Sequence, residues 1–190
     1  MADYCTVADV KALAGASLTT DDVLLATLVT RASAIVDEYT GRTFAAATLT
    51  RYYTPGVDTN ANTLYLGADL LSVTTLTVDG TVIPADGYTL HPLNATPKTY
   101  LRLKSAYDWA YPDELEGTIV LAGSWGYSTT VPADVVQATA RLALWLYRQR
   151  EAPFSRVGNA ITGEYEVPVA LPDDVCALLD GYRRLVWGGA

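Results

Sequence analysis

The most sustained hydrophobic pattern in the chain has the helical period and covers residues 131–150. Apolar residues recur there at the three- and four-residue spacing of one helix face: Val135, Ala138, Leu142, Trp145 and Leu146. Pro132 and Asp134 suit the first turn, where proline loses no hydrogen bond and a carboxylate faces the positive end of the helix dipole. A helix that is apolar over most of its circumference must be covered by other elements. The pattern therefore predicts a central helix.

The polar stripe of this helix is narrow, and two of its members are arginines. Arg141 and Arg148 lie seven residues apart, which places them one above the other on the helix surface. We expect them to pair with acidic residues, within the chain or on a neighbouring subunit, and not to act on a substrate. The arginine stripe, more than the apolar face, is where we expect contact with a neighbouring subunit.

Two helical patterns precede the central one. Thr6 and Asp9 have the spacing of a weak capping box, and Gly15 can end the short helix that they begin. A second helix is expected over residues 20–40, with Gly41 as its C-terminal cap. Its expected apolar face consists of Leu24, Leu28, Ala32, Ile35 and Tyr39, with Leu25, Val29 and Val36 beside them.

Between residues 44 and 128 the helical period gives way to short alternating stretches separated by turn residues. Asp79-Gly80 between two such stretches is a strong signal for a two-residue hairpin. The connections are too short for parallel crossovers, so the strands must pair antiparallel. Residues 104–116 form a polar-aromatic loop. Strands are expected at 49–53, 63–66, 72–78, 81–83, 88–90, 100–103 and 117–122.

Residues 151–171 hold two glycines and two prolines and show no sustained period. A connection of this length in a compact domain is uncommon and is often functional. It is a candidate docking arm, which could contain a hairpin with Gly158-Asn159 at its tip, and the alternative is a surface loop. The arm residues expected to meet another protein are Phe154, Arg156, Glu164 and Tyr165.

A last helix begins at Pro172-Asp173, and its apolar side comprises Val175, Leu178, Leu179, Tyr182 and Val186. Arg183 and Arg184 suit its C-terminal end, where cations face the negative end of the helix dipole. Together with Tyr182 they complete the expected interaction residues.

These elements predict an α+β fold, in which a small helical bundle surrounds a central helix and an antiparallel β subdomain is inserted between helices. We expect a single domain over residues 1–190. Its expected parts are N-terminal helices (1–43), the β subdomain (44–128), the central helix (129–150), an extended arm or loop (151–171) and a C-terminal helix (172–190).

Composition narrows the classes of function. The net charge of −8 disfavours a sequence-specific DNA-binding protein, because an acidic surface repels phosphates. The same charge suits the wall of a channel through which DNA must pass without adhering. No apolar run approaches the roughly 18–20 residues of a membrane span, so no membrane partner is expected. Without a recognisable signal peptide, Cys5 and Cys176 are expected to stay reduced. The 13 tyrosines favour sheets and interfaces.

The sequence signals for catalytic groups are weak. His91 is the sole histidine, and residues 123–126 (GSWG) fail the G-x-S-x-G pattern because Ala122 replaces its first glycine. Asp113, Glu114 and Glu116 match no calcium loop. We therefore expect no enzyme, no cofactor and no metal. Two alternatives stay open: a carbohydrate- or ligand-binding protein using residues 109–111 (WAY), and a hydrolase using Ser124 or the cluster at 113–116.

The order of elements resembles that of the head–tail connector proteins of tailed bacteriophages, the neck adaptors that bind beneath the portal. The resemblance rests on four segments: residues 37–44 (DEYTGRTF), 70–80 (LLSVTTLTVDG) with Asp86-Gly87-Tyr88, 123–127 leading into 131–151, and 178–184 (LLDGYRR).

This resemblance implies a structural virion protein that forms a homo-oligomeric ring, usually a dodecamer, below the portal. The ring would bind the portal protein, extend the DNA channel and offer a surface to the tail or a tail-completion protein. DNA would pass through without sequence recognition. The expected location is the virion neck, with the host cytoplasm during assembly.

Overall fold

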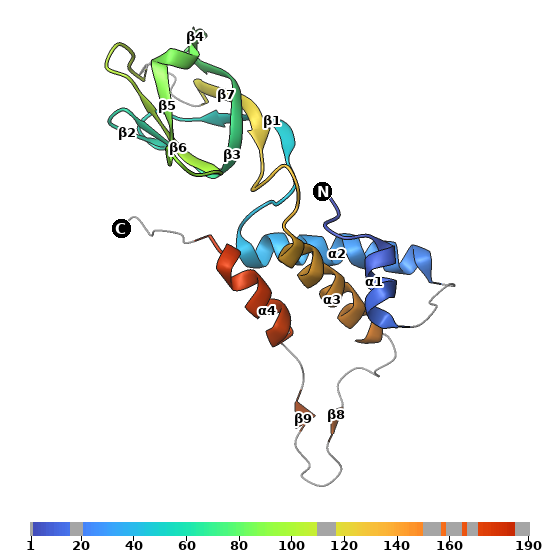
Figure 1. Ribbon diagram of the computed structural model, residues 1–190. Coiled ribbons are helices and arrows are strands. Elements are labelled where there is room, and N and C mark those ends of the chain that lie inside the picture. The colour runs from blue at the N-terminus through green and yellow to red at the C-terminus, as the bar shows by residue number, and fades with distance from the viewer. Residues whose placement is uncertain are drawn as a thin grey trace. The chain divides into compact units, whose positions relative to one another are not determined.

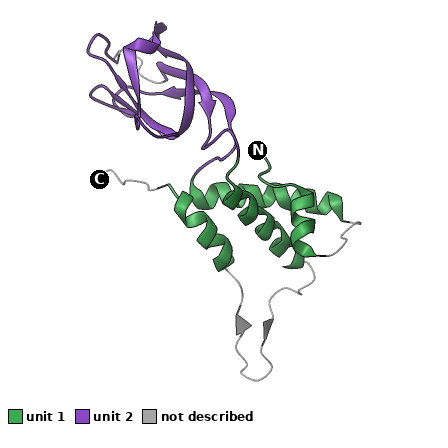
Figure 2. Cartoon of the chain, viewed as in Figure 1, with its two compact units in different colours: residues 1–41, 131–190 green, residues 42–130 purple. Residues whose placement is uncertain are grey.

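The computed structural model describes residues 2–15, 21–109, 117–149, 157–158, 165–166 and 171–184. The chain forms two compact units (Figure 2). The helical unit comprises Met1–Gly41 and Val131–Ala190, and the β unit comprises Arg42–Thr130. Helices and an antiparallel seven-stranded sheet in the described residues confirm the predicted α+β class.

The helical unit is built around α3, which contacts each of the other helices (Figure 1). Its elements are α1 (Val7–Ala14), α2 (Asp22–Thr40), α3 (Ala133–Gln149), α4 (Asp173–Leu179) and the 3₁₀ turn η2 (Asp180–Tyr182). Val135, Ala138 and Leu142 are fully buried on α3, where they meet buried side chains of the other helices. The predicted central helix is therefore confirmed.

The predicted caps of the first two helices are confirmed. The backbone N–H of Asp9 donates to Thr6 Oγ1 at 3.2 Å, and the backbone N–H of Thr6 donates to Asp9 Oδ2 at 2.7 Å, which completes a capping box. Gly15 and Gly41 end α1 and α2 in the left-handed region, with φ of 66° and 64°. A side chain there would be strained, so glycine ends both helices.

Three details of the predicted helices are wrong. The buried face of α2 is centred on Leu25, Val29 and Val36, so Leu24 lies exposed at its border. Trp145 and Leu146 of α3 are only half-buried, because the apolar face of that helix is rotated away from them. The last α-helix ends at Leu179 and continues only as η2.

The β unit contains one sheet with the strand order β1-β7-β3-β6-β5, in which β2 and β4 also pair with β3 (Figure 1). Every pairing among these strands is antiparallel, as predicted. The strands are β1 (Ala47–Tyr53), β2 (Thr59–Asn60), β3 (Thr63–Val78), β4 (Thr81–Ile83), β5 (Tyr88–His91), β6 (Lys98–Leu103) and β7 (Ile119–Trp125), with a 3₁₀ turn η1 (Ala85–Gly87) before β5.

Strand β3 corrects the expectation of two separate strands at 63–66 and 72–78. It is continuous, and it changes partner along its length: residues near Leu64 pair with β6, and residues near Leu76 pair with β7. Gly67 adopts a left-handed φ of 59°, and the pairing register shifts on both sides of Leu70. Such irregularities bend a strand without ending it, so one strand serves both halves of the sheet.

The predicted hairpin at Asp79-Gly80 is confirmed. Val78 pairs with Thr81, and both turn residues have positive φ, 46° and 75°, as a type I′ turn requires. Buried apolar side chains from the strands of the β unit form a cluster that includes Leu76, Trp109 and Trp125. Residues 123–125, which fail the G-x-S-x-G pattern, form the end of β7, and Trp125 there is buried.

The two chain segments that enter and leave the β unit are tied together. Tyr127 N–H donates to the carbonyl of Thr43 at 2.9 Å, and the Phe44 and Tyr127 rings pack with centroids 5.5 Å apart. Arg42 stacks over Tyr127, and its Nη1 donates to both carboxylate oxygens of the buried Asp69 at 2.7 and 2.8 Å. Two of the segments that carried the resemblance, 37–44 and 123–127, thus meet here.

Among the helices that the structure describes, none is long and apolar enough to cross a membrane.

Candidate interaction surface

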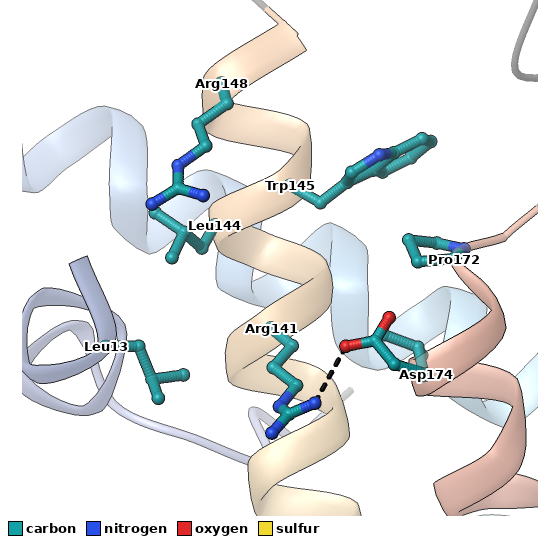
Figure 3. Close-up of a pocket in the computed structure, with 8 residues that line it drawn as sticks. Leu13, Arg141, Leu144, Trp145, Arg148, Pro172 and Asp174 are labelled. Atoms are coloured by element: carbon teal, nitrogen blue, oxygen red, sulfur yellow. Dashed lines mark hydrogen bonds and ion pairs between the residues drawn. The ribbon is translucent and has the colours of Figure 1, made fainter.

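A surface hollow of about 290 Å³ lies on the helical unit, where α3 passes between the end of α1 and the start of α4 (Figure 3). It contains both arginines of the predicted stripe, together with apolar side chains from three helices. The lining residues are Leu13, Arg141, Leu144, Trp145, Arg148, Pro172, Asp174 and Val175.

The two arginines differ in their partners. Arg141 Nη1 lies 2.8 Å from Asp174 Oδ2, which confirms the expectation of an acidic partner and ties α3 to α4 (Figure 3). Both side chains of this pair are well exposed, so solvent screens the attraction. Arg148 is exposed and forms no ion pair with any described residue. Its charge is therefore available to a carboxylate from another molecule.

The apolar part of the hollow is partly open. Leu13 is 43% exposed, and Trp145 is half-buried and extends toward Pro172 (Figure 3). Leu13 also borders a second, mostly apolar hollow between α1 and α3. Together these features can hold apolar side chains of a bound protein while Arg148 pairs with an acidic one.

Sequence reasoning identified the arginines but missed Leu13, Trp145 and Pro172 as surface residues. Leu13 belongs to the apolar stripe of α1, and Trp145 belongs to that of α3, so their periodicity alone indicated burial. The missing signal was which part of α3 the other helices cover, and this depends on contacts between residues distant in sequence.

The C-terminal members of the expected interaction residues, Tyr182, Arg183 and Arg184, contact other residues of the helical unit. The Tyr182 hydroxyl donates to Asp134 Oδ2 at 3.2 Å, and the Arg184 N–H donates to the carbonyl of Thr40 at 2.8 Å. The Arg183 guanidinium lies 5.1 Å from the centroid of the Tyr39 ring. A hydrogen bond to Asp180 raises the pKa of Tyr39 above its usual range. These contacts fix the end of the described chain against α2 and α3.

The predicted arm is only partly described. Phe154, Arg156 and Glu164 lie outside the described residues. Tyr165 belongs to β9 (Tyr165–Glu166), whose backbone pairs antiparallel with β8 (Val157–Gly158). The hairpin interpretation is therefore confirmed, but its position is wrong, because Gly158 pairs with Tyr165 in the ladder and does not form the tip.

The candidate chemical groups are dispersed. The His91 ring stacks on Tyr100 with centroids 4.8 Å apart, and Ser124 lies within the paired strand β7. Trp109, which motivated the ligand-binding alternative, is 4% exposed in the core of the β unit. Asp113, Glu114 and Glu116 lie outside the described residues.

The part of the chain that the structure describes forms no metal site, and its buried Cys5 is not a reactive thiol. It contains no group of three or more His, Cys, Asp or Glu side chains arranged to hold a metal ion. Burial raises the pKa of the Cys5 thiol to about 12, with Asp9 adding to the effect, so Cys5 stays protonated at neutral pH.

Solved structures of similar fold come from gene transfer agent (GTA) particles. A chain from the neck of an empty GTA particle, computed with C6 symmetry, matches with a TM-score of 0.63 and 21% identity over 99% of this chain and 96% of that one. A chain from the neck of a native GTA particle, computed with C12 symmetry, matches with a TM-score of 0.60 and 20% identity over 88% and 86%. A third chain, from the virion of a native GTA particle, matches with a TM-score of 0.58 and 23% identity over 91% of this chain and 84% of that one.

Among curated proteins, no relative matches the chain. A family model does match, over residues 3–185, and its description is head completion protein. The match covers both units, and it confirms the resemblance to structural proteins of the phage head–tail junction. The chain is therefore a member of the head completion protein family.

Proposed function

We propose that the chain is a non-enzymatic structural subunit that closes into a ring in the neck of a phage-like particle. The observation that carries the proposal is the fold, which matches chains of GTA necks computed with C12 and C6 symmetry over most of both chains. Family membership supports a role in completing the head. A ring of identical subunits requires two different surfaces on each copy that meet head to tail.

The finer features of the proposal are a dodecameric ring beneath the portal protein, a tail or tail-completion protein on its other side, and a central channel for DNA. The net charge of −8 supports the channel, since an acidic wall does not retain phosphates. The ring would assemble in the host cytoplasm and remain in the virion neck.

The hollow on the helical unit is the proposed contact with another subunit, the portal or the tail. Interfaces are enriched in tryptophan, tyrosine and arginine, and here Trp145 and Arg148 lie beside the exposed Leu13. Arg141 borders the same surface while its charge is shared with Asp174. The arm residues Phe154, Arg156, Glu164 and Tyr165, and the terminal residues Tyr182, Arg183 and Arg184, are proposed as additional contacts.

Electron microscopy and mass photometry of the purified chain, alone and mixed with portal rings, test the proposal. We expect rings of about twelve copies, either free or on the portal, as the neck architecture of similar chains suggests. A chain that stays monomeric with and without portal rings would overturn it.

A charge reversal tests the hollow. Arg148→Glu should weaken assembly at least about tenfold, a change of about 1.4 kcal/mol, because it places a like charge against an acidic partner. Arg31→Glu is the matched control, since Arg31 is an exposed arginine of α2 outside the hollow. Equal assembly of the two variants would exclude the hollow as an interface.

Deletion of residues 155–166 tests the arm. We expect the thermal unfolding midpoint of the monomer to change little, because the described cores of both units lie elsewhere. Assembly, measured by mass photometry, should be impaired. Loss of folding on deletion would show instead that the segment belongs to a core.

A further inference from the structure

Three aromatic side chains form a row across the outer surface of the β unit. Tyr65 of β3 and His91 of β5 both pair with Tyr100 of β6 in the strand register. The Tyr65 and Tyr100 ring centroids are 6.4 Å apart, and the His91 ring is parallel to that of Tyr100 within 3°. Tyr65 is 54% exposed. The row is thus a rigid aromatic surface that the core does not use.

Positive charge lies on the same side of β6. Lys98 and Arg102 stand two residues before and after Tyr100, and side chains two residues apart in a strand share a face. Lys104 follows β6 and is exposed. Residues 87–107 contain these three cations and no Asp or Glu, in a chain whose net charge is −8. This basic-aromatic face is therefore a local exception to an acidic protein.

The cations of this face are not neutralised within the described chain. Arg102 makes one long contact, 3.4 Å, to the neutral amide oxygen of Asn62. The Lys98 ammonium donates to the carbonyls of Pro92 and Leu93 at 2.6 and 3.1 Å, which leaves its charge uncompensated. Lys104 forms no ion pair with a described residue.

We propose that the basic-aromatic face, residues Tyr65, His91, Lys98, Tyr100 and Arg102 with Lys104, binds the acidic surface of a second copy of this chain. The inference rests on the proposed ring function and assigns the two surfaces by which neighbouring subunits meet. Tyrosine and arginine provide most of the binding energy in many interfaces, and complementary charge fixes the partner.

The acidic counterpart lies on the helical unit. Asp134, Asp173, Asp174 and Asp180 are exposed at the start of α3, at the start of α4 and in η2. Asp134 accepts a hydrogen bond from Tyr182, Asp174 pairs with Arg141, and Asp180 accepts a hydrogen bond from Tyr39. Asp173 has no hydrogen bond or ion pair with any described residue, so it is the member most open to a cation of another copy. Because the two surfaces differ, their contact is head to tail, and repeated rotation can close it into a ring.

The same features favour a protein partner over DNA. The His91 ring stacks on one face of the Tyr100 ring, so that face is closed to an inserted base, and the Tyr65 ring lies tilted by 45° beside it. The Lys98 ammonium is held by two backbone carbonyls, and a duplex would also meet the repulsion of the remaining acidic surface.

Sedimentation velocity of the full chain with the double variant Arg102→Glu/Lys104→Glu tests the proposal. We expect self-association to weaken at least tenfold relative to the native chain and to the control Arg31→Glu. Raising the salt concentration from 50 to 500 mM should weaken the native association as well. Adding Asp173→Lys to the double variant should restore association in part, because a cation of the helical unit then faces the new carboxylates of the β unit.

Unchanged association of the double variant, in a native chain that does associate, would overturn this inference alone. A native chain that never associates, with or without portal rings, would overturn the proposed function and this inference with it. Loss of binding to a DNA duplex in the double variant, with association intact, would assign the face to DNA instead. Circular dichroism of each variant excludes unfolding as the cause of a loss.

Discussion

Each unit of the chain contains an arginine–aspartate pair of nearly the same length, but the two pairs lie in different surroundings. In the β unit, Arg42 Nη1 lies 2.7 Å from Asp69 Oδ1, and the side chains are 18% and 2% exposed. In the helical unit, Arg141 Nη1 lies 2.8 Å from Asp174 Oδ2, and the side chains are 38% and 55% exposed. Distance alone therefore does not rank the two contacts.

The difference separates a structural pair from an exchangeable one. A buried carboxylate that loses its partner cannot recover its hydration, so the Arg42–Asp69 pair stays together as long as the protein is folded. An exposed pair exchanges with water at little cost, so Arg141 and Asp174 can be drawn to charges on another molecule. The helical unit thus keeps its charges accessible, while the β unit encloses a pair where its entering and leaving segments meet.

The largest expected effect follows removal of one partner of the buried pair. Asp69→Ala should lower the free energy of unfolding by about 3–5 kcal/mol, because Arg42 stays partly buried without its carboxylate. Roughly 6–20 °C of midpoint temperature would be lost in a chain of this size. Differential scanning calorimetry measures the shift. A loss below about 1 kcal/mol would mean that burial does not distinguish the two pairs.

Replacing both partners of the buried pair should cost less than replacing one. Arg42→Met with Asp69→Leu removes both charges and retains apolar volume, a change that is often close to neutral in other proteins. We expect less than half of the loss seen for Asp69→Ala, measured by urea unfolding followed through tryptophan fluorescence. An equal or greater loss would show that the stacking of Arg42 on Tyr127 carries the stability instead.

Removal of the exposed capping box of α1 should cause a loss of stability between those of the buried and the exposed ion pair. Thr6→Ala should lower the free energy of unfolding by about 1 kcal/mol, because it removes the acceptor of the Asp9 N–H. The Thr6 hydrogen bonds also hold the pKa of Asp9 below its ordinary value of 3.8. The stability that Asp9 adds is thus complete above pH 3.8 and is lost as the pH falls through the folded pKa. Urea titrations at pH 7 and pH 3 measure both effects, and equal losses at the two pH values would contradict the assignment.

The helices and the hairpin were predictable because their signals are local. Thr6 and Asp9 lie three residues apart, and Asp79-Gly80 is a turn whose residue types alone specify its geometry. The continuity of β3 was not predictable, since Gly67 interrupts the alternation that marks a strand and the register shifts around Leu70 hide its two partners.

The contacts that define the surfaces depend on pairings distant in sequence. The periodicity of α3 placed Arg141 on a polar stripe, but its partner Asp174 lies 33 residues away on another helix. The aromatic row was invisible for the same reason, because Tyr65 and Tyr100 meet only through the register of β3 with β6. Burial of Trp109 likewise follows from the shape of the sheet, and nothing in its neighbours indicated it.

The smallest expected effect completes the comparison between the two pairs. Arg141→Ala should change the free energy of unfolding by less than about 1 kcal/mol, because solvent screens the exposed pair and the arginine gains freedom when it is released. A double-mutant cycle with Asp174→Ala isolates the coupling between the two side chains, which we expect to be about 0.2–1 kcal/mol and to fall with added salt. A coupling as large as that of Arg42 with Asp69 would show that the hollow behaves as an interior even without a bound partner. A small coupling combined with a clear assembly defect of Arg141→Ala would indicate that this arginine stabilises the complex more than the fold.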